Sequence, residues 1–255
     1  MVENRLWPHA LEHPAAREVL GLAYYNHSMW LNAIGRLREA AQFAQRSRQM
    51  ALNVDGTGRA RRSRWWPHAV IIYASSLARQ SRRRAIEELR RYEGAAMAAR
   101  FTEYFQRELA ELYSLAGNFD RAKCHIERAV NAAAEMDARS QNVVQRDYAR
   151  ILLRDNQAAA ALERIPDPAS GPPHHQAQSL VLQIMALRQL SKNNDEAARC
   201  RQRLADLLSQ RPHLQPLVSA EVVSDQENRE RSSKKEPSQA GDEDAEVSYS
   251  GELHR

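Results

Sequence analysis

Several residue pairs in this chain of 255 residues have side chains that could bind a metal ion or take part in catalysis. The two adjacent pairs are His174-His175 and Cys124-His125. Neighbouring residues on a helix point about 100° apart, so neither pair predicts a chelate for one ion. No nucleophile with a base and no pair of carboxylates stands at a recognisable spacing. The sequence therefore predicts no catalytic site, no metal site and no cofactor, and we expect a protein that is not an enzyme.

A short glycine motif was considered as a phosphate loop. Gly56-Thr57-Gly58 has two glycines, but neither Gly-Lys-Ser/Thr nor a further glycine follows at the required spacing. It also does not follow a predicted strand, which a phosphate-binding loop of this kind requires. We interpret the motif as a flexible connection.

An arginine-rich stretch is the strongest chemical signal. Residues 56–100 contain 11 arginines and 3 acidic residues, a local charge of +8. The basic patch consists of Arg59, Arg61, Arg62, Arg64, Arg82, Arg83 and Arg84. Arginines beside Trp65-Trp66 are able to contact phosphates and stack a base, which makes nucleic-acid binding or transcription regulation the alternative hypothesis. An acidic protein partner, or a solvated face with both tryptophans in the core, explains the same residues without a nucleic-acid motif.

The composition favours helices as the elements that carry these residues. Charged residues make up 27% of the chain and aromatic residues 6%, with few glycines and prolines inside the apolar runs. Cys124 and Cys200 stand far apart and form no CxxC motif, which fits a reducing compartment. The first ten residues lack the pattern of a signal peptide, and no apolar run reaches the ~18 residues of a membrane span. We expect a cytoplasmic protein that does not contact a membrane.

The charge is distributed unevenly along the chain. Residues 1–100 carry 17 lysines and arginines against 8 acidic residues, whereas residues 220–255 carry 5 against 10. The last segment is also poor in apolar residues and cannot bury enough surface to fold, so it is predicted to be disordered. The predicted organisation is an N-terminal extension over 1–13, a helical repeat domain over 14–219 and a disordered acidic tail over 220–255.

One segment, residues 101–130, has the pattern of a helix hairpin. Its apolar and small residues are Leu109, Ala110, Tyr113, Phe119, Ala122, Ile126 and Ala129. They place one apolar stripe on each of two helices, and Gly117-Asn118 supplies a tight turn between them. Ala110 and Ala122 are small enough to let the two helices approach closely.

A second segment repeats this order, with Ser28 where Gly117 stands in the first. Its matching residues are Leu20, Gly21, Tyr24, Trp30, Ala33, Leu37 and Ala40. Both segments resemble tetratricopeptide repeats, and the opening of the chain resembles members of that family from GC-rich actinobacteria. The resemblance implies an all-α, right-handed superhelical solenoid of about five antiparallel helix hairpins.

Weaker copies are found by following the small residue near the start of each second helix. These residues are Ala33, Ala85, Ala122, Ala160 and Ala197. The longer first interval is explained by an insertion over residues 53–63. The fifth copy departs from the pattern at Arg188 and Arg201, and Pro166 is predicted to stop the second helix of the fourth.

The resemblance also implies where a partner binds. Such arrays bind peptides in a concave groove lined by the first helix of each hairpin. The pattern places the groove at Glu18, Leu22, Tyr25, Tyr104, Arg107, Glu111, Ser114, Asn142 and Gln145, with Ala149 beside them. We therefore expect a scaffold or adaptor for a protein or peptide partner, an acidic one being one option. The sequence leaves the oligomeric state open.

Overall fold

The computed structural model describes residues 13–219 except 34–35, 53–64, 99, 170, 191–193 and 217. Within these ranges the chain forms ten α-helices, one short 3₁₀ helix and no strand. The helices are α2 (Pro14–Ala33), α3 (Leu37–Ala51), α4 (Trp66–Ala78), α5 (Arg82–Ala98), α6 (Thr102–Leu115), α7 (Phe119–Ala133), α8 (Ala138–Arg154), α9 (Ala158–Arg164), α10 (Pro173–Gln189), α11 (Asn194–Gln210) and η1 (Pro212–Leu214). The predicted acidic tail, nearly all of the predicted extension, and Gly56 and Gly58 lie outside the described residues.

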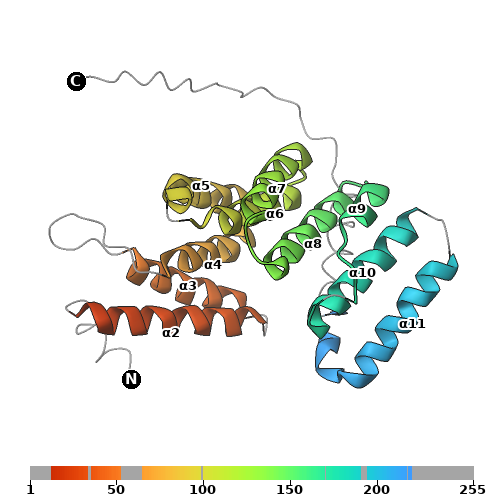
Figure 1. Cartoon of the computed structure of the whole chain (residues 1–255). Helices are drawn as coiled ribbons and strands as arrows, with labels where there is room; N and C mark the ends of the chain where they lie inside the picture. The colour runs from red at the N-terminus through yellow and green to blue at the C-terminus, as the bar shows by residue number, and fades with distance from the viewer. Residues whose placement is uncertain are drawn as a thin grey trace, which may run out of the picture.

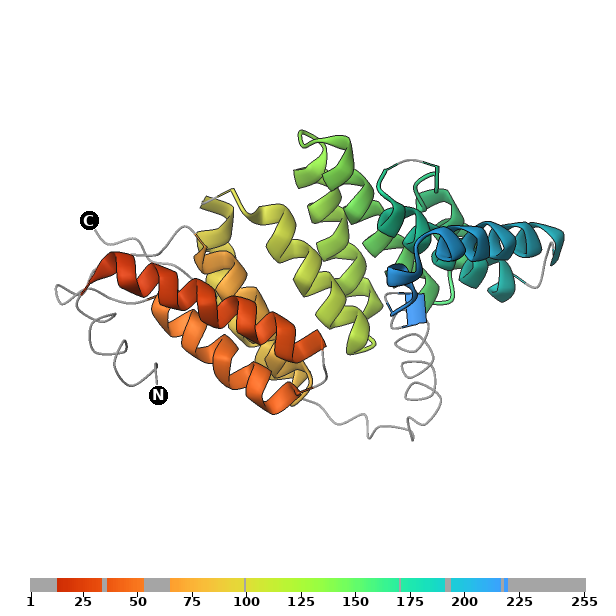
Figure 2. The ribbon, with the colours of Figure 1, turned by 90° about the horizontal axis from the view of Figure 1, so that it is seen from below.

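Consecutive helices pair into five antiparallel hairpins, as predicted: α2–α3, α4–α5, α6–α7, α8–α9 and α10–α11. The hairpins follow one another in a row, and each first helix except α2 packs on the first helix before it (Figure 1). Seen from below, the helices of a hairpin lie side by side, and the hairpins change direction along the row (Figure 2). Because each hairpin buries its apolar stripe against its neighbours, one core cluster runs from α3 to α10, and a separate cluster lies between α10 and α11.

The turns of the third and fourth hairpins share one hydrogen-bond pattern. The backbone N–H of Asn118 donates to the carbonyl of Tyr113 at 2.9 Å, and Gln157 N–H donates to Leu152 in the same way at 2.8 Å. The residue before each donor has a positive φ, 77° at Gly117 and 57° at Asn156. Glycine and asparagine tolerate this left-handed backbone, which ends the first helix. The turn predicted at Gly117-Asn118 is therefore confirmed.

Small residues bring the two helices of a hairpin together. Ala110 of α6 and Ala122 of α7 have no exposed surface. In the first hairpin the Ser28 hydroxyl donates to the carbonyl of Ala40 at 2.9 Å, directly between the helices. A Cβ atom added to Gly21 would lie 2.9 Å from Cβ of Met50 and closer still to the Trp65 ring. Each of these positions excludes a larger side chain.

The register predicted for the first hairpin is wrong. Ser28 is not the turn residue, because α2 continues through it to Ala33, so Ala33 ends the first helix instead of opening the second. The N–H of Arg36 donates to the carbonyl of Leu31 at 2.9 Å, which matches the bond of Asn118. The counterpart of Ala122 is therefore Ala40, seven residues later than predicted.

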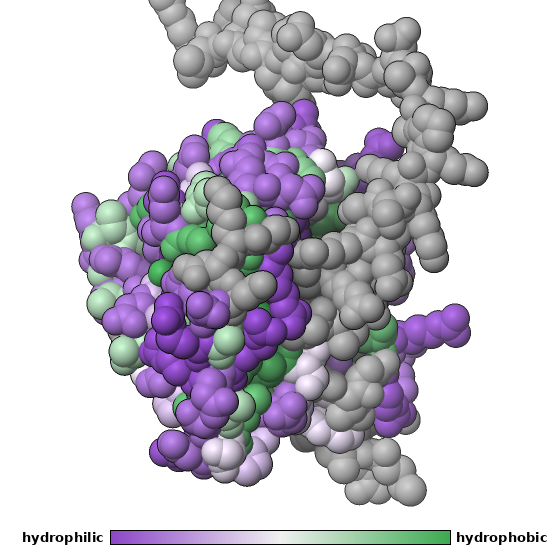
Figure 3. All heavy atoms as spheres, turned by 90° about the vertical axis from the view of Figure 1, so that its right-hand side faces the viewer, coloured by the Kyte–Doolittle hydropathy of each residue, from purple (hydrophilic) through white to green (hydrophobic). Residues whose placement is uncertain are grey.

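The later hairpins follow the predicted pattern more closely. Ala85 and Ala197 are buried as the fourth residues of α5 and α11, as Ala122 is in α7. In the fourth hairpin this position belongs to Ala161 instead of the predicted Ala160. Helix α9 ends at Arg164, just before Pro166, as predicted. Hydrophilic side chains dominate the face over the last hairpin, with smaller hydrophobic areas between them (Figure 3).

Enlarging Ala122 should destabilise the whole array. We expect Ala122→Leu to lower the free energy of unfolding by about 1–3 kcal/mol, because the added atoms force α6 and α7 apart. Urea unfolding followed by circular dichroism measures the change. Ala198→Leu on the exposed side of α11 is the matched control and should stay within about 0.5 kcal/mol of wild type. Equal stability of the two variants would contradict the packing described for the third hairpin.

Candidate partner-binding surface

The first helices α2, α4, α6 and α8 share one side of the array, which we call the first-helix face. Three aromatic rings from successive hairpins meet on it. The ring of His68 on α4 lies 6.4 Å from that of Tyr25 on α2 and 5.1 Å from that of Tyr104 on α6, between centroids. All three side chains are half-buried. The rings therefore form a continuous aromatic wall across three hairpins.

Burial keeps this aromatic wall uncharged near neutral pH. It raises the pKa of Tyr25, and burial together with the nearby Tyr25 raises the pKa of Tyr104 to about 12. The same loss of solvation lowers the pKa of His68. Nδ1 of His68 is buried and has no hydrogen-bond partner within the described residues. The wall thus offers apolar ring surface and one unused polar atom.

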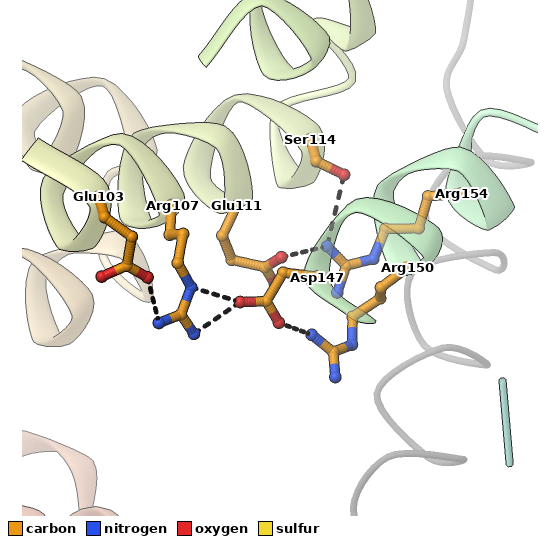
Figure 4. Close-up of polar contacts among 7 residues, drawn as sticks. All are labelled: Glu103, Arg107, Glu111, Ser114, Asp147, Arg150 and Arg154. Carbon is orange, nitrogen blue, oxygen red and sulfur yellow. Dashed lines mark hydrogen bonds and ion pairs between the residues drawn. The ribbon is translucent and has the colours of Figure 1, made fainter. Parts of the chain in front are cut away.

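A network of ion pairs joins α6 to α8 (Figure 4). Arg107 of this network lies one turn after Tyr104 of the aromatic wall on α6. Nε of Arg107 donates to Oδ2 of Asp147 at 2.7 Å, and Nη1 of Arg107 donates to Glu103 at 3.0 Å. Arg150 donates to the other oxygen of Asp147 at 2.7 Å. Burial alone raises the pKa of Asp147, but Arg150 and Arg107 outweigh it and hold this pKa below its ordinary value. Asp147 is therefore a carboxylate shared by two arginines.

A second link between the same helices lies one turn further along. Nη1 of Arg154 lies 2.8 Å from Oε2 of Glu111 and 3.4 Å from the Ser114 hydroxyl. The Arg154 side chain is largely buried, so this pair is shielded from solvent better than a surface pair. Arg107 and Glu111, both predicted to bind a partner, are thus already engaged with charges of the neighbouring hairpin.

Glu108 differs from the other acids of this region, because it forms no ion pair with any residue that the structure describes. Its Oε1 lies 2.5 Å from the hydroxyl of Ser75 on α4. Burial, together with the nearby Glu111 and Asp147, raises its pKa to about 7, although the Ser75 hydroxyl and the charge of Arg107 act in the opposite direction. The Ser75 oxygen also lies 2.9 Å from the carbonyl of Ile71.

The single hydroxyl hydrogen of Ser75 cannot serve both acceptors at once. A protonated Glu108 donates to Ser75, whose hydroxyl then donates to Ile71, so the neutral acid satisfies every group. When Glu108 is ionised, Ser75 has to give up Ile71 in order to donate to it. The surroundings therefore suit the neutral form and leave the charged form short of donors.

Apolar side chains continue the face along α2. Leu22 and Met29 stand one turn before and after Tyr25 on the same side of the helix and are 46% and 47% exposed. Val19 and Trp30, also exposed, lie on an adjoining side. Exposed large apolar residues of this kind mark interaction sites when they cluster.

The structure brings only some of the predicted groove residues together. In the third hairpin Tyr104, Arg107, Glu111 and Ser114 belong to the wall or the ion-pair network. The error in the first hairpin is seven residues, which is about two helical turns, so Leu22 and Tyr25 still lie on the face and Glu18 is exposed. In the fourth hairpin Asn142 and Gln145 are half-buried and Ala149 is fully buried. Oε1 of Gln145 has no hydrogen-bond partner in the part of the chain that the structure describes.

The structure describes only three of the seven arginines of the basic patch. Arg59, Arg61, Arg62 and Arg64 lie outside them. Arg82, Arg83 and Arg84 begin α5, and Arg83 pairs with Glu87. Trp66 is buried against Phe105 and Tyr92, so this ring is core and is not available to stack a base.

The sequence patterns did not point to several members of the site: His68, Ser75, Glu108, Asp147, Arg150 and Arg154. The one-residue error in the fourth hairpin placed Ala149 where Arg150 belongs. A signal for the first hairpin was present, since residue 35 is a glycine and precedes Arg36 as Gly117 precedes Asn118. No spacing pattern shows that Ser75 and Glu108 meet, because they come from different hairpins.

Neither a cluster of metal ligands nor a membrane-spanning helix is present among the described residues. Within 13–219, gaps excepted, no group of three or more His, Cys, Asp or Glu side chains is arranged to hold a metal ion. In the same part of the chain no helix is both long enough and apolar enough to cross a membrane.

Comparison with known proteins supports the fold. No protein-family model matches the chain, and no curated protein does either. A crystal structure from Podospora anserina, described as a putative kinesin light chain with nearly identical TPR-like repeats, superimposes with a TM-score of 0.57. The match covers 78% of this chain and 98% of that one at 16% identity. The chain thus has the fold of a TPR-like helical repeat, whereas the actinobacterial resemblance stays a prediction.

The raised pKa of Glu108 predicts a pH-dependent cost to stability. Between its ordinary value of 4.5 and about 7, the folded protein binds a proton that the unfolded chain has lost. The free energy of unfolding therefore falls as the pH rises through this window. Glu108→Gln is neutral at every pH and should gain on the order of 2 kcal/mol over wild type between pH 5 and pH 8.

Urea unfolding of both proteins at several pH values measures this gain. Because His68 titrates in both proteins, its contribution drops out when the two free energies of unfolding are subtracted at each pH. Glu87→Gln, an exposed carboxylate on α5, serves as the control and should show no such trend. A gain that is the same at pH 5 and pH 8 would show that Glu108 titrates normally.

Proposed function

We propose that this chain is a non-enzymatic protein-interaction scaffold, which binds a segment of a partner protein along the first-helix face. The main support is the convergence of Tyr25, His68 and Tyr104 from three successive hairpins beside the exposed Leu22 and Met29. Half-buried aromatic rings next to apolar side chains are the typical centre of a peptide-binding surface. The TPR-like fold is consistent with this role, although a shared fold does not fix a function. A cytoplasmic location and a bacterial origin are parts of the same proposal.

The ion-pair network has a positioning role in this proposal. Arg107 and Arg154 of two neighbouring hairpins are bound to Asp147 and Glu111, so they fix the spacing of α6 and α8. A rigid first-helix face binds a partner at a lower entropic cost than a mobile one. Arg107 and Arg154 are balanced by the acids that they pair with and attract an acidic partner only weakly. The charges on this face therefore do not favour the acidic partner that the sequence left open.

The nucleic-acid alternative gains no support from the described residues. The Trp66 ring that would stack a base lies in the core, and Arg83 pairs with an acid on its own helix. Four of the seven arginines in the patch lie outside the described ranges. A peptide-binding scaffold is therefore the function that we prefer.

Charging the apolar part of the first-helix face should abolish partner binding. We expect Leu22→Glu with Met29→Glu to fold normally, since both side chains are about half exposed, and to lose the protein that copurifies with the wild-type chain. Affinity purification from the native source, with nuclease added, followed by mass spectrometry measures the loss.

The matched control changes two equally exposed methionines away from this face, Met97→Glu with Met136→Glu. This variant should retain the partner. If both double variants keep the partner, or both lose it, the first-helix face is not the binding surface. In a parallel purification without nuclease, material that binds equally well to all three proteins and is lost when nuclease is added would favour the nucleic-acid alternative.

A further inference from the structure

From the surroundings of Glu108 we infer that the partner segment presents a lysine or arginine side chain, which Glu108 binds beside the aromatic wall. The inference rests on the proposed function and adds the chemistry of the partner to it. Glu108 lies on α6 one turn from Tyr104, and Ser75 of α4 lies on its other side. The carboxyl group is therefore on the first-helix face, between the second and third hairpins.

Among the described residues no cation forms an ion pair with Glu108, although the charge of Arg107 acts on it. On α6, Arg107 is bonded to Glu103 and Asp147, and on α8 Arg150 is bonded to Asp147 and Arg154 to Glu111. Of the four acids in this region, three have an arginine and Glu108 has a hydroxyl. From α4 it faces Ser75, and His68 and Tyr25 near it are neutral at pH 7. An arriving ammonium or guanidinium group thus meets one carboxylate that no other cation occupies.

The hydroxyl of Ser75 supports this assignment. Only one of Ile71 and ionised Glu108 receives its hydrogen, so the ionised acid lacks a donor that the neutral acid does not need. A basic side chain supplies that donor together with a positive charge. A buried carboxyl group that has a hydroxyl but no ion pair among the described residues is more typical of a binding site than of a core.

The aromatic wall suits the rest of such a side chain. Lysine and arginine have apolar stems that pack along ring surfaces, and their charges are attracted to the faces of tyrosine rings. Tyr104 lies one turn before Glu108 on α6, the charges of Tyr25 and Glu108 both act on Tyr104, and burial keeps both phenols protonated. Leu22 and Met29, further along α2, fit apolar residues of the same segment. The expected ligand is therefore a segment with apolar residues and one basic residue that fits between α4 and α6.

Random peptides displayed on phage, selected on the full chain at pH 8, test the inference. We expect the selected peptides to share a lysine or arginine at one position. Replacing that residue by glutamine should weaken binding to the wild-type chain about tenfold, and Glu108→Gln should weaken binding of the parent peptide by a similar factor. Combining both changes should cost little more than either alone, because both remove the same contact. Glu87→Gln should leave the affinity unchanged.

The pH dependence is a second readout that a purely structural role would not give. Binding of the parent peptide to the wild-type chain should tighten from pH 6 to pH 8 as Glu108 ionises, whereas binding to Glu108→Gln should not. Peptides that need Leu22 and Met29 but show no coupling to Glu108 would overturn the inference and leave the proposed function intact. Failure to select any peptide that depends on Leu22 and Met29 would contradict the proposed function, and this inference with it.

Discussion

The close approach of two helices within each hairpin is the constraint on which the array depends. Ala110 against Ala122, and Ser28 against Ala40, leave no room for a branched side chain between the helix axes. A hairpin formed in this way still exposes one apolar stripe, and only the next hairpin covers it. The spacing of the first helices, and hence of Tyr25, His68 and Tyr104, is therefore fixed by residues that never contact a partner.

Ion pairs between neighbouring hairpins occur on both sides of the array. Away from the first-helix face, Arg48 of α3 pairs with Glu88 of α5 and contacts Tyr92, which ties two second helices together. On the first-helix face, Arg107 and Arg154 do the same for α6 and α8. Partly buried ion pairs of this kind contribute more to a defined geometry than to net stability. They hold the face in one arrangement, and Glu108 remains the acid in this region whose charge is unbalanced.

The sequence predicted the helices, the number of hairpins and the turn at Gly117, because these follow from local patterns. It placed the turn of the first hairpin seven residues too early, because Ser28 resembles a turn residue. In the structure Ser28 is a small residue packed between the two helices. Leu22 and Tyr25 still lie on the first-helix face despite this error, since seven residues are about two helical turns. A one-residue error in the fourth hairpin was more damaging, because it rotates the helix by about 100° and exchanged Arg150 for the buried Ala149.

The pairing of Ser75 with Glu108 shows why the centre of the site could not be predicted. The two residues are 33 positions apart, and neither departs from an ordinary helical sequence. What distinguishes Glu108 is an excess of negative charge around it. Its neighbours Glu103, Glu111 and Asp147 each pair with an arginine, whereas Glu108 pairs with none among the described residues. An excess of negative charge of this kind can be recognised only when the ion-pair partner of every neighbouring charge is known. Residues that serve binding are often ones that lower stability. We expect the folded protein to be more stable with an amide than with a carboxyl group at position 108. The inferred basic residue of a partner therefore explains Glu108 better than the packing of the array does.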